Sequence, residues 1–403
     1  MNDKEIIETE NRLMANVFAK RGLVITRGKG ATLWDINGKE YVDCMGGYGV
    51  ALLGHCHPRV IAAIHVQVEQ LISCHASLYN DKRSEFLEKL VAITPKGLNK
   101  AFLSNSGAES VECAIKLARK FTGKPEIIAM MGAFHGKTMG ALSATWDKKY
   151  REPFLPLVPE FKHVPPDNLE KLREVISDKT AAILLEPIRG EGGIRVPPDG
   201  FLQGLRALCD EKNILLIFDE VQTGFGRTGK VFACEHWGVT PDIMCLAKPF
   251  AGGLPIGITV AKENIMSAFK LGEHSTTFSG GPLVCAAGCA AIDALISEKL
   301  VDRAAVNGAY FKAQLEALQA KHKIIKEVRG KGLMLGVELR FDVFNVILKA
   351  AEKGVLILDA GRNVLRFLPP LVISKEQINK AIAVLDAVLE EEENARASGS
   401  TAN

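Results

Sequence analysis

The sequence predicts an α/β domain built on a mostly parallel sheet, followed by a smaller α+β domain. Between about residues 60 and 290, short apolar runs bounded by Gly, Pro or Asp alternate with helical patterns. Such runs are typical of strands buried on both faces, and intervening helices favour parallel pairing. The expected strands are 101–103, 127–130, 182–185, 214–218, 243–246 and 256–260.

The two ends of the chain predict further elements. Residues 22–45 alternate in hydropathy around Asn37-Gly38, which is a hairpin turn signal. A long helical stretch near 283–321 precedes three apolar runs and a final helix, whose start carries a capping box formed by Ser374 and Gln377. The three runs lie at 332–339, 355–358 and 364–367.

These patterns divide the chain into four parts. We expect an N-terminal segment over 1–55 that packs with the small domain, and a large domain over 56–285. A small C-terminal domain over 286–394 follows, and the Ser/Ala-rich residues 395–403 predict a disordered tail.

Composition excludes several classes of protein. Apolar residues make up 47% and charged residues 24%, which is ordinary for a globular enzyme, and the net charge of +3 with no basic block argues against nucleic-acid binding. Nine cysteines without a Cys-x-x-Cys pair argue against a disulfide framework or a zinc site. The acidic N-terminus lacks a signal peptide and no apolar stretch is long enough to span a bilayer, so we expect a cytoplasmic protein that does not bind membranes.

The first feature that predicts chemistry is the segment 104–110, Ser-Asn-Ser-Gly-Ala-Glu-Ser, between a strand and a helix. Small residues at a helix start let several backbone N–H groups point at one anion, so this segment predicts a phosphate cradle. A plain serine N-cap explains the same residues equally well.

The second feature is Asp219, which ends the strand Ile-Leu-Leu-Ile-Phe. An acid at the carboxyl end of a parallel strand faces the ligand crevice, whereas an acid inside the strand would be buried at high cost. The following Gly224-Phe-Gly-Arg-Thr-Gly229 fits G-x-G-x-x-G and leaves a nicotinamide oxidoreductase as an alternative, although no periodic helix follows at once.

The third feature is Lys248, directly after an apolar strand and before a glycine-rich loop. A lysine at the mouth of a buried strand loses hydration, its pKa falls, and it can form an imine. A snorkelling surface lysine is the alternative. A phosphate cradle, an acid and a lysine at ends of one sheet together match the needs of pyridoxal 5′-phosphate (PLP).

With these motifs, residues 20–392 resemble the class III aminotransferases of the ornithine/acetylornithine type, which are PLP-dependent enzymes of fold type I with a seven-stranded-type sheet. The resemblance implies that Lys248 is the Schiff-base lysine and that Asp219 keeps the pyridine nitrogen protonated. The other cofactor-binding residues that it implies are Gln222 at the ring hydroxyl, Ser106, Gly107 and Ala108 at the phosphate, Phe134 against the ring and His135 beside it. Thr277 resembles the threonine that reaches the neighbouring subunit's cofactor, which implies a homodimer.

The same resemblance indicates how two unlike substrates are bound. Arg366 is similar to the arginine that clamps the α-carboxylate of glutamate or 2-oxoglutarate, and Glu191 to the glutamate that masks it for the other substrate. Tyr48 stands where relatives place a tyrosine facing the far end of the substrate. Two positions depart from the family pattern, since Lys137 replaces an arginine and Gly281 an asparagine.

Segments 43–50 and 143–157 resemble most the subgroup that acts on an acidic amino-group carrier protein of the LysW type in lysine and arginine biosynthesis. The resemblance implies transfer of the terminal amino group between glutamate and a carrier-bound semialdehyde. A basic rim at the pocket mouth would suit such a partner. Its candidate residues are Lys137, Lys148, Lys149, Arg151, Arg189 and Arg195.

Three alternatives stay open besides the carrier-dependent enzyme. Acetylornithine or ornithine aminotransferase on free substrates is the nearest, and a PLP-dependent mutase or decarboxylase or a nicotinamide oxidoreductase belong to other classes. His55-Cys-His57 offers only three neighbouring donors, so we expect a structural turn there and no metal.

Overall fold

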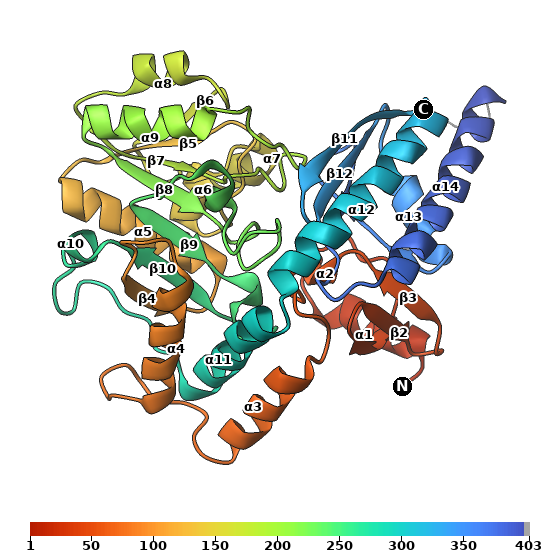
Figure 1. Ribbon diagram of the computed structural model, residues 1–403, viewed down its shortest axis with the longest axis horizontal. Coiled ribbons are helices and arrows are strands. Elements are labelled where there is room, and N and C mark those ends of the chain that lie inside the picture. Colours follow the sequence, from red (N-terminus) through yellow and green to blue (C-terminus); the bar gives the residue numbers. More distant parts are fainter. Residues whose placement is uncertain (399–403) are drawn as a thin grey trace.

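The computed structural model describes residues 1–398, and its largest sheet has seven strands (Figure 1). They are β4 (Lys100–Ser104), β5 (Glu126–Met130), β6 (Phe161–Val164), β7 (Thr180–Leu185), β8 (Leu215–Asp219), β9 (Ile243–Leu246) and β10 (Gly257–Ala261). Their order across the sheet is β4-β10-β9-β8-β7-β5-β6. Four neighbouring pairs are parallel and β10 is antiparallel to both β4 and β9, so the predicted mostly parallel sheet is confirmed.

The central strands are buried on both faces, as their unbroken apolar runs predict. In β5, Ile127 and Ala129 join one hydrophobic core with the apolar face of α5 (Gly107–Thr122), while Ile128 and Met130 join the other. The core opposite α5 includes α9 (Phe201–Lys212) and α11 (Pro282–Ser297). The edge strand β6 was not predicted, because Phe161-Lys-His-Val is not a continuous apolar run and is only partly buried.

Two four-stranded sheets stand beside the large one, in the right half of Figure 1. The first combines N-terminal strands β1 (Ile25–Lys29), β2 (Thr32–Asp35) and β3 (Glu40–Asp43) with β13 (Val355–Leu356). The second has the order β11 (Ile325–Lys331), β12 (Met334–Leu339), β15 (Val364–Phe367) and β14 (Leu358–Asp359). The hairpin around Asn37-Gly38 is present between β2 and β3.

Three boundaries differ from the predictions. The apolar run 355–358 is divided between two sheets, because β13 pairs with β3 whereas β14 pairs with β15. The helical stretch near 283–321 is two helices, α11 and α12 (Leu300–Lys321), separated where Lys299 adopts a φ of 52°. The final helix α14 (Lys375–Ala397) begins at the predicted capping box and continues past the expected tail start at 395; residues 399–403 of that tail lie outside the described part of the chain.

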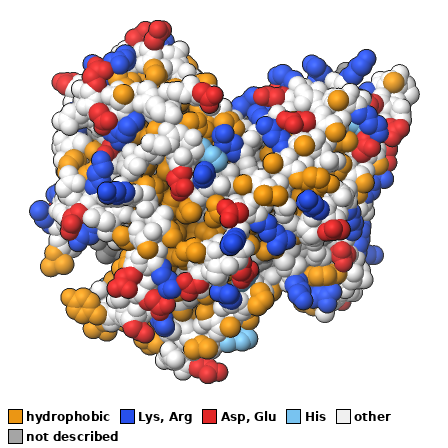
Figure 2. All heavy atoms as spheres, in the orientation of Figure 1, with side chains coloured by type: hydrophobic (Ala, Val, Ile, Leu, Met, Phe, Trp, Pro, Cys, Tyr) orange, Lys and Arg blue, Asp and Glu red, His pale blue; other side chains and the backbone are white. Residues whose placement is uncertain are grey.

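The remaining helical elements are short or lie at the surface. They are α1 (Asp3–Leu13), α2 (Gly46–Gly49), α3 (Pro58–Val68), α4 (Asp81–Ile93), α6 (Met139–Ala144), α7 (Lys148–Arg151), η1 (Glu152–Phe154), α8 (Leu169–Val175), η2 (Ala233–Trp237), η3 (Lys248–Ala251), α10 (Glu263–Met266) and α13 (Phe344–Glu352). Within residues 1–398 no helix combines the length and apolarity needed to cross a bilayer. On the face in Figure 2, basic and acidic side chains are interspersed and hydrophobic ones gather toward the middle.

Candidate active site

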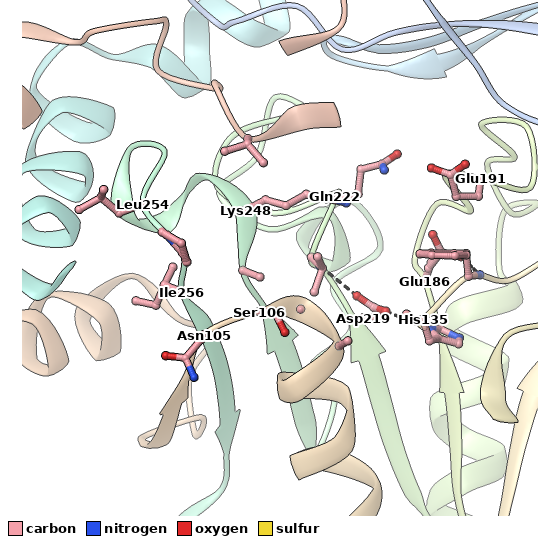
Figure 3. Close-up of a pocket in the computed structure, with 18 of the residues that line it drawn as sticks. Asn105, Ser106, His135, Glu186, Glu191, Asp219, Gln222, Lys248, Leu254 and Ile256 are labelled. Carbon is pink, nitrogen blue, oxygen red and sulfur yellow. Dashed lines mark hydrogen bonds and ion pairs between the residues drawn. The ribbon is translucent and has the colours of Figure 1, made fainter. Parts of the chain in front are cut away.

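A cavity of about 390 Å³ lies at the carboxyl ends of the strands of the large sheet. The sequence-predicted residues that line it are Ser106, Gly107, Ala108, Phe134, His135, Glu191, Asp219, Gln222 and Lys248. Figure 3 shows Ser106 at the start of α5, with Lys248 and Asp219 on neighbouring segments of the same cavity. Residues separated by more than a hundred positions in the sequence therefore meet at one place.

The first turn of α5 forms the anion-binding end of the cavity. Ser106 is the N-cap, and its Oγ accepts the backbone N–H of Glu109 at 3.2 Å, so the plain N-cap interpretation also holds. The neighbouring strand approaches very closely, since a Cβ on Gly257 would lie 2.1 Å from the carbonyl oxygen of Ser106. The small residues here keep the helix N-terminus close to the cavity wall and accessible to an anion.

Asp219 is fixed at the end of β8 by two hydrogen bonds. Its Oδ1 accepts the N–H of Val221 at 3.0 Å, and its Oδ2 lies 2.8 Å from Nδ1 of His135. Because a carboxylate only accepts, Nδ1 of His135 carries the proton that it donates. Both side chains are almost fully buried, so the histidine orients the carboxylate that faces the cavity.

Lys248 is the first residue of η3 and is separated from the end of β9 by Ala247 alone. Its φ of 45° lies in the left-handed region, which bulky residues seldom adopt and which is typical of functional sites. Burial lowers the pKa of its ammonium group, and the charge of Asp219 partly opposes that change. The structure thus supplies a desolvated amine beside the strand-end acid, as the sequence predicts.

Arg366 and Glu191 form an ion pair at the edge of the cavity. Nη1 of Arg366 donates to Oε1 of Glu191 at 2.5 Å and lies 3.4 Å from Oε1 of Gln222. Arg366 is fully buried, and its Nε has no hydrogen-bond partner among residues 1–398. Its guanidinium carbon lies 5.7 Å from the ring centroid of Tyr48, which places that half-exposed tyrosine beside the pair.

Glu186 is a cavity residue that the sequence analysis missed. Its carboxylate accepts the backbone N–H groups of Phe134 at 3.1 Å and Gly190 at 3.0 Å. Burial raises its pKa to about 7, the charge of His135 opposes this rise, and that of Asp219 adds to it. The signal was present, because Glu186 follows the strand Ala-Ala-Ile-Leu-Leu just as Asp219 follows its own strand.

Four predicted residues lie outside the set that lines the cavity, and one of them is Arg366 at its edge. Lys137 is exposed, and its Nζ lies 4.9 Å from the ring centroid of Tyr150, whose ring meets that of the cavity residue Phe134 edge-on at 5.8 Å. Thr277 is exposed on the loop between α10 and α11. Tyr48 lies next to Arg366, outside the cavity lining.

The family model for aminotransferase class III matches residues 14–389. The chain belongs to this family. It is 47% identical over 401 residues to an acetylornithine aminotransferase of Methanopyrus kandleri, covering 99% of this chain and all of the relative. It is 45% identical over 391 residues to a [LysW]-aminoadipate semialdehyde transaminase of Deinococcus radiodurans, with 96% and 91% covered. A crystal structure of the ornithine aminotransferase from Toxoplasma gondii superposes with a TM-score of 0.94 at 36% identity, covering 98% of this chain and 96% of the other.

This class III aminotransferase therefore uses PLP, and the cavity fits that cofactor. When bound, PLP supplies an aldehyde carbon that takes the amino group and a ring that withdraws electrons. The N-terminus of α5 would hold its phosphate, Asp219 its pyridine nitrogen and Lys248 its aldehyde carbon. The glycine loop 224–229 does not contribute to the cavity wall: Gly226 packs against Leu295 and Leu371, so the dinucleotide alternative is excluded by both family and packing.

Proposed function

We propose that this aminotransferase moves the terminal amino group of an ornithine- or lysine-type chain to 2-oxoglutarate, and the amino group of glutamate to the corresponding semialdehyde. The ion pair of Arg366 and Glu191 at the cavity edge carries this proposal. A free guanidinium matches the α-carboxylate of glutamate bidentately. When Arg366 is paired with Glu191, the charge of its guanidinium is neutralised. This suits a substrate that places an uncharged chain or an amine, and not a carboxylate, beside Arg366.

Within this proposal each cavity residue has one task. Asp219, held by His135, keeps the pyridine nitrogen protonated, and an adjacent carboxylate raises the pKa of such a nitrogen by about 1–3 pH units. With PLP bound, Nζ of Lys248 would be the base that moves the proton at the substrate carbon that carries the amino group. The lowered pKa of Lys248 favours the neutral amine, which is the form that accepts a proton.

We also propose that the enzyme is a homodimer. Exposed large apolar side chains gather on α3 and the segment that follows it, and Phe278 lies beside Thr277 on another exposed loop. The exposed apolar residues of α3 and of the segment after it include Ile61, Val66, Val68, Leu71 and Ile72. A surface of this kind is typical of subunit contacts, and a dimer would bring Thr277 toward a second cavity. Sedimentation velocity of the purified enzyme tests the assembly.

A carrier-protein-bound substrate is the form of the reaction that we favour. Of the six candidate rim residues, Arg189 is paired with Asp167 and Arg195 with Glu327 and Glu338, so these two are excluded from a free rim. The other four form the basic rim, in which Lys149 is well exposed although it pairs with the half-exposed Asp147 at 3.2 Å: Lys137, Lys148, Lys149 and Arg151. Nζ of Lys149 and Nζ of Lys137 lie 4.7 and 4.9 Å from the ring centroid of Tyr150, whose ring contacts that of Phe134, so this rim adjoins the cavity.

Free N-acetylornithine or ornithine is the second candidate substrate, because several relatives at 44–47% identity are named acetylornithine aminotransferase. The test compares kcat/KM for free N-acetylornithine with that for ornithine and lysine attached to an acidic carrier protein, with 2-oxoglutarate as acceptor. Preference for the carrier-bound amines, reduced by Lys148→Glu with Lys149→Glu and by added salt, supports the first form. The control is Lys179→Glu, an exposed lysine at the opposite, amino end of β7. Equal or better use of N-acetylornithine supports the second form.

A further inference from the structure

Glu191 is carried by a short hairpin of residues 189–195, called here the Glu191 hairpin. The backbones of Arg189 and Arg195 pair through two hydrogen bonds of 3.1 and 3.0 Å. Inside the turn, the carbonyl oxygen of Gly190 accepts the N–H groups of Gly193 and Ile194. Because these bonds close the turn, the backbone of Glu191 moves with the hairpin and not independently of it.

This hairpin packs on one face of the C-terminal sheet. Arg329, Gly336 and Arg366 lie directly opposite one another across β11, β12 and β15, so their side-chain positions share that face. Gly336 leaves the middle of this row open, and the fully buried Ile194 fills it: a Cβ on Gly336 would lie 3.0 Å from the Cβ of Ile194. On one side Arg366 binds Glu191, and on the other Nε of Arg329 donates to the carbonyl oxygen of Gly193 at 2.8 Å.

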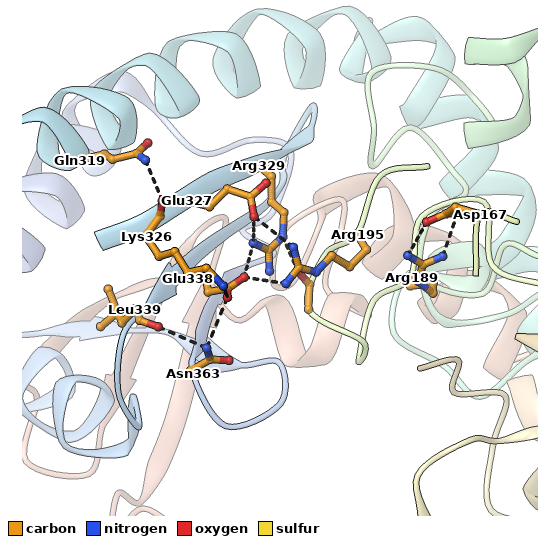
Figure 4. A network of polar contacts seen from close by, with 11 residues as sticks. Asp167, Arg189, Arg195, Gln319, Lys326, Glu327, Arg329, Glu338, Leu339 and Asn363 are labelled. Atoms are coloured by element: carbon orange, nitrogen blue, oxygen red, sulfur yellow. Dashed lines mark hydrogen bonds and ion pairs between the residues drawn. The ribbon is translucent and has the colours of Figure 1, made fainter. Parts of the chain in front are cut away.

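The next row of the same face carries two carboxylates that hold the base of the hairpin (Figure 4). Nη2 of Arg195 donates to Glu338 at 2.6 Å, and its Nη1 donates to Glu327 at 3.0 Å. Arg329 also donates to Glu338, at 2.7 Å. Burial alone would raise the pKa of Glu338, but hydrogen bonds from Lys326 and Arg329 and the charge of Arg195 lower it to about 2. Glu338 is thus a buried anion shared between the sheet and the hairpin.

Arg189, the other residue at the base of the hairpin, contacts a part of the molecule outside the C-terminal sheet. Nη1 and Nη2 of Arg189 donate to the two carboxylate oxygens of Asp167 at 3.2 and 2.9 Å. The N–H of Gly190 donates to Glu186 in the cavity wall. Consequently the hairpin bridges the cavity wall and the sheet that carries Arg366. Of the two residues at its base, Arg195 pairs with carboxylates of that sheet, whereas Arg189 pairs with Asp167.

We propose that the ion pair of Arg195 and Glu338 positions Glu191 against Arg366 and thereby sets how often Arg366 is free to bind an α-carboxylate. This inference rests on the proposed function, in which Glu191 masks Arg366. Arg195 and Glu338 are positioning residues, because neither lines the cavity. Since Arg366 and Glu338 belong to the same sheet face, loosening the Arg195 contact lets the hairpin, and Glu191 with it, withdraw from Arg366.

The experiment uses the PLP-loaded enzyme with L-ornithine as amino donor and 2-oxoglutarate as acceptor. L-ornithine offers both an α-amino and a terminal amino group, and an unmasked Arg366 favours binding of its α-carboxylate and transfer of the α-amino group. Arg195→Gln and Glu338→Gln should each raise the ratio of α to terminal transfer by about fivefold or more. They should leave kcat for glutamate within about twofold of the wild-type value, since the chemical groups are unchanged.

Lys326→Gln is the matched control. Lys326 donates to the same carboxylate at 2.7 Å, but it is exposed and belongs to β11, not to the hairpin. It should retain the wild-type product ratio. If Glu338→Gln does not fold, Arg195→Gln carries the test, because Glu338 then keeps Arg329 and Lys326 as partners.

The reference variant Glu191→Gln distinguishes the masking of Arg366 by Glu191 from the positioning of Glu191 by Arg195 and Glu338. If it raises α transfer while Arg195→Gln and Glu338→Gln do not, the masking of Arg366 stands and the positioning role is wrong. If Lys326→Gln raises α transfer as much as Glu338→Gln, general loosening of the sheet explains the effect and the positioning role is again wrong. If Glu191→Gln itself leaves the ratio unchanged, Glu191 does not mask Arg366 and the proposed function fails together with this inference.

Discussion

Glu186→Gln should abolish a pH dependence of stability that the wild-type enzyme shows near neutrality. Burial raises the pKa of Glu186 from 4.5 to about 7. Between these values the unfolded chain releases the proton and the folded enzyme keeps it, so folding stability falls as the pH rises. At about 1.4 kcal/mol per pH unit over about 2.5 units, the loss amounts to about 3 kcal/mol, which is present in full above about pH 7.

Thermal unfolding of purified wild-type and variant enzymes at several pH values between about 5 and 8 measures this effect. With an unfolding entropy of about 2.1 cal/mol/K per residue over 403 residues, about 3 kcal/mol corresponds to about 4 °C in Tm. The Tm of Glu186→Gln relative to wild type should therefore rise by about that amount across the range. The amide resembles the protonated carboxyl, since each retains one good acceptor for the N–H groups of Phe134 and Gly190. A difference in Tm that stays constant from pH 5 to pH 8 would refute the reasoning.

Three further changes test the cofactor site. Asp219→Asn should lower kcat by about 10- to 1000-fold while the enzyme still binds PLP, because the pKa of the pyridine nitrogen is then no longer raised by about 1–3 pH units. Stopped-flow half-reactions measure the rate. An unchanged kcat would contradict the role of Asp219 in protonating this nitrogen. Gly257→Ala should weaken PLP binding at least about tenfold, since its Cβ would lie 2.1 Å from the carbonyl oxygen of Ser106 and displace the helix start; fluorescence titration checks this. Lys248→Ala should remove the visible absorbance of the internal imine and at least about 1000-fold of the activity, whereas retained turnover would exclude Lys248 as the base.

Apolar runs predicted the central strands, and charged edge strands escaped prediction for a physical reason. The run 243–246 is buried on both faces, so its composition alone identifies it as a strand. In β11 the residues Lys326, Glu327 and Arg329 resemble a solvated segment, because their partners are remote. Glu327, for example, is paired with Arg195, 132 residues away along the chain. Nothing local in the sequence indicates such pairing.

In the candidate site, too, the sequence predicts some residue positions but not the contacts that depend on distant segments. Strand ends fix where Asp219 and Lys248 lie, and the sequence predicts both from the residues before them. The contact of His135 with Asp219 depends on how the segment after β5 folds across the edge of the sheet. The resemblance to the family indicated only that His135 lies beside the cofactor ring. The face of the C-terminal sheet that holds Glu191 depends on strand register, and a shift by one residue would turn Glu338 away from it.

The central claim is that Glu191 masks Arg366 for one of two unlike substrates, and single-turnover half-reactions of Glu191→Gln test it most directly. Without the carboxylate, Arg366 should stay free, so the rate and apparent affinity for glutamate should be kept or improved. The half-reaction with the terminal amine of N-acetylornithine, or of the carrier-bound amine if wild type prefers it, should slow at least about tenfold. Equal changes in both half-reactions, or none in either, would contradict the account.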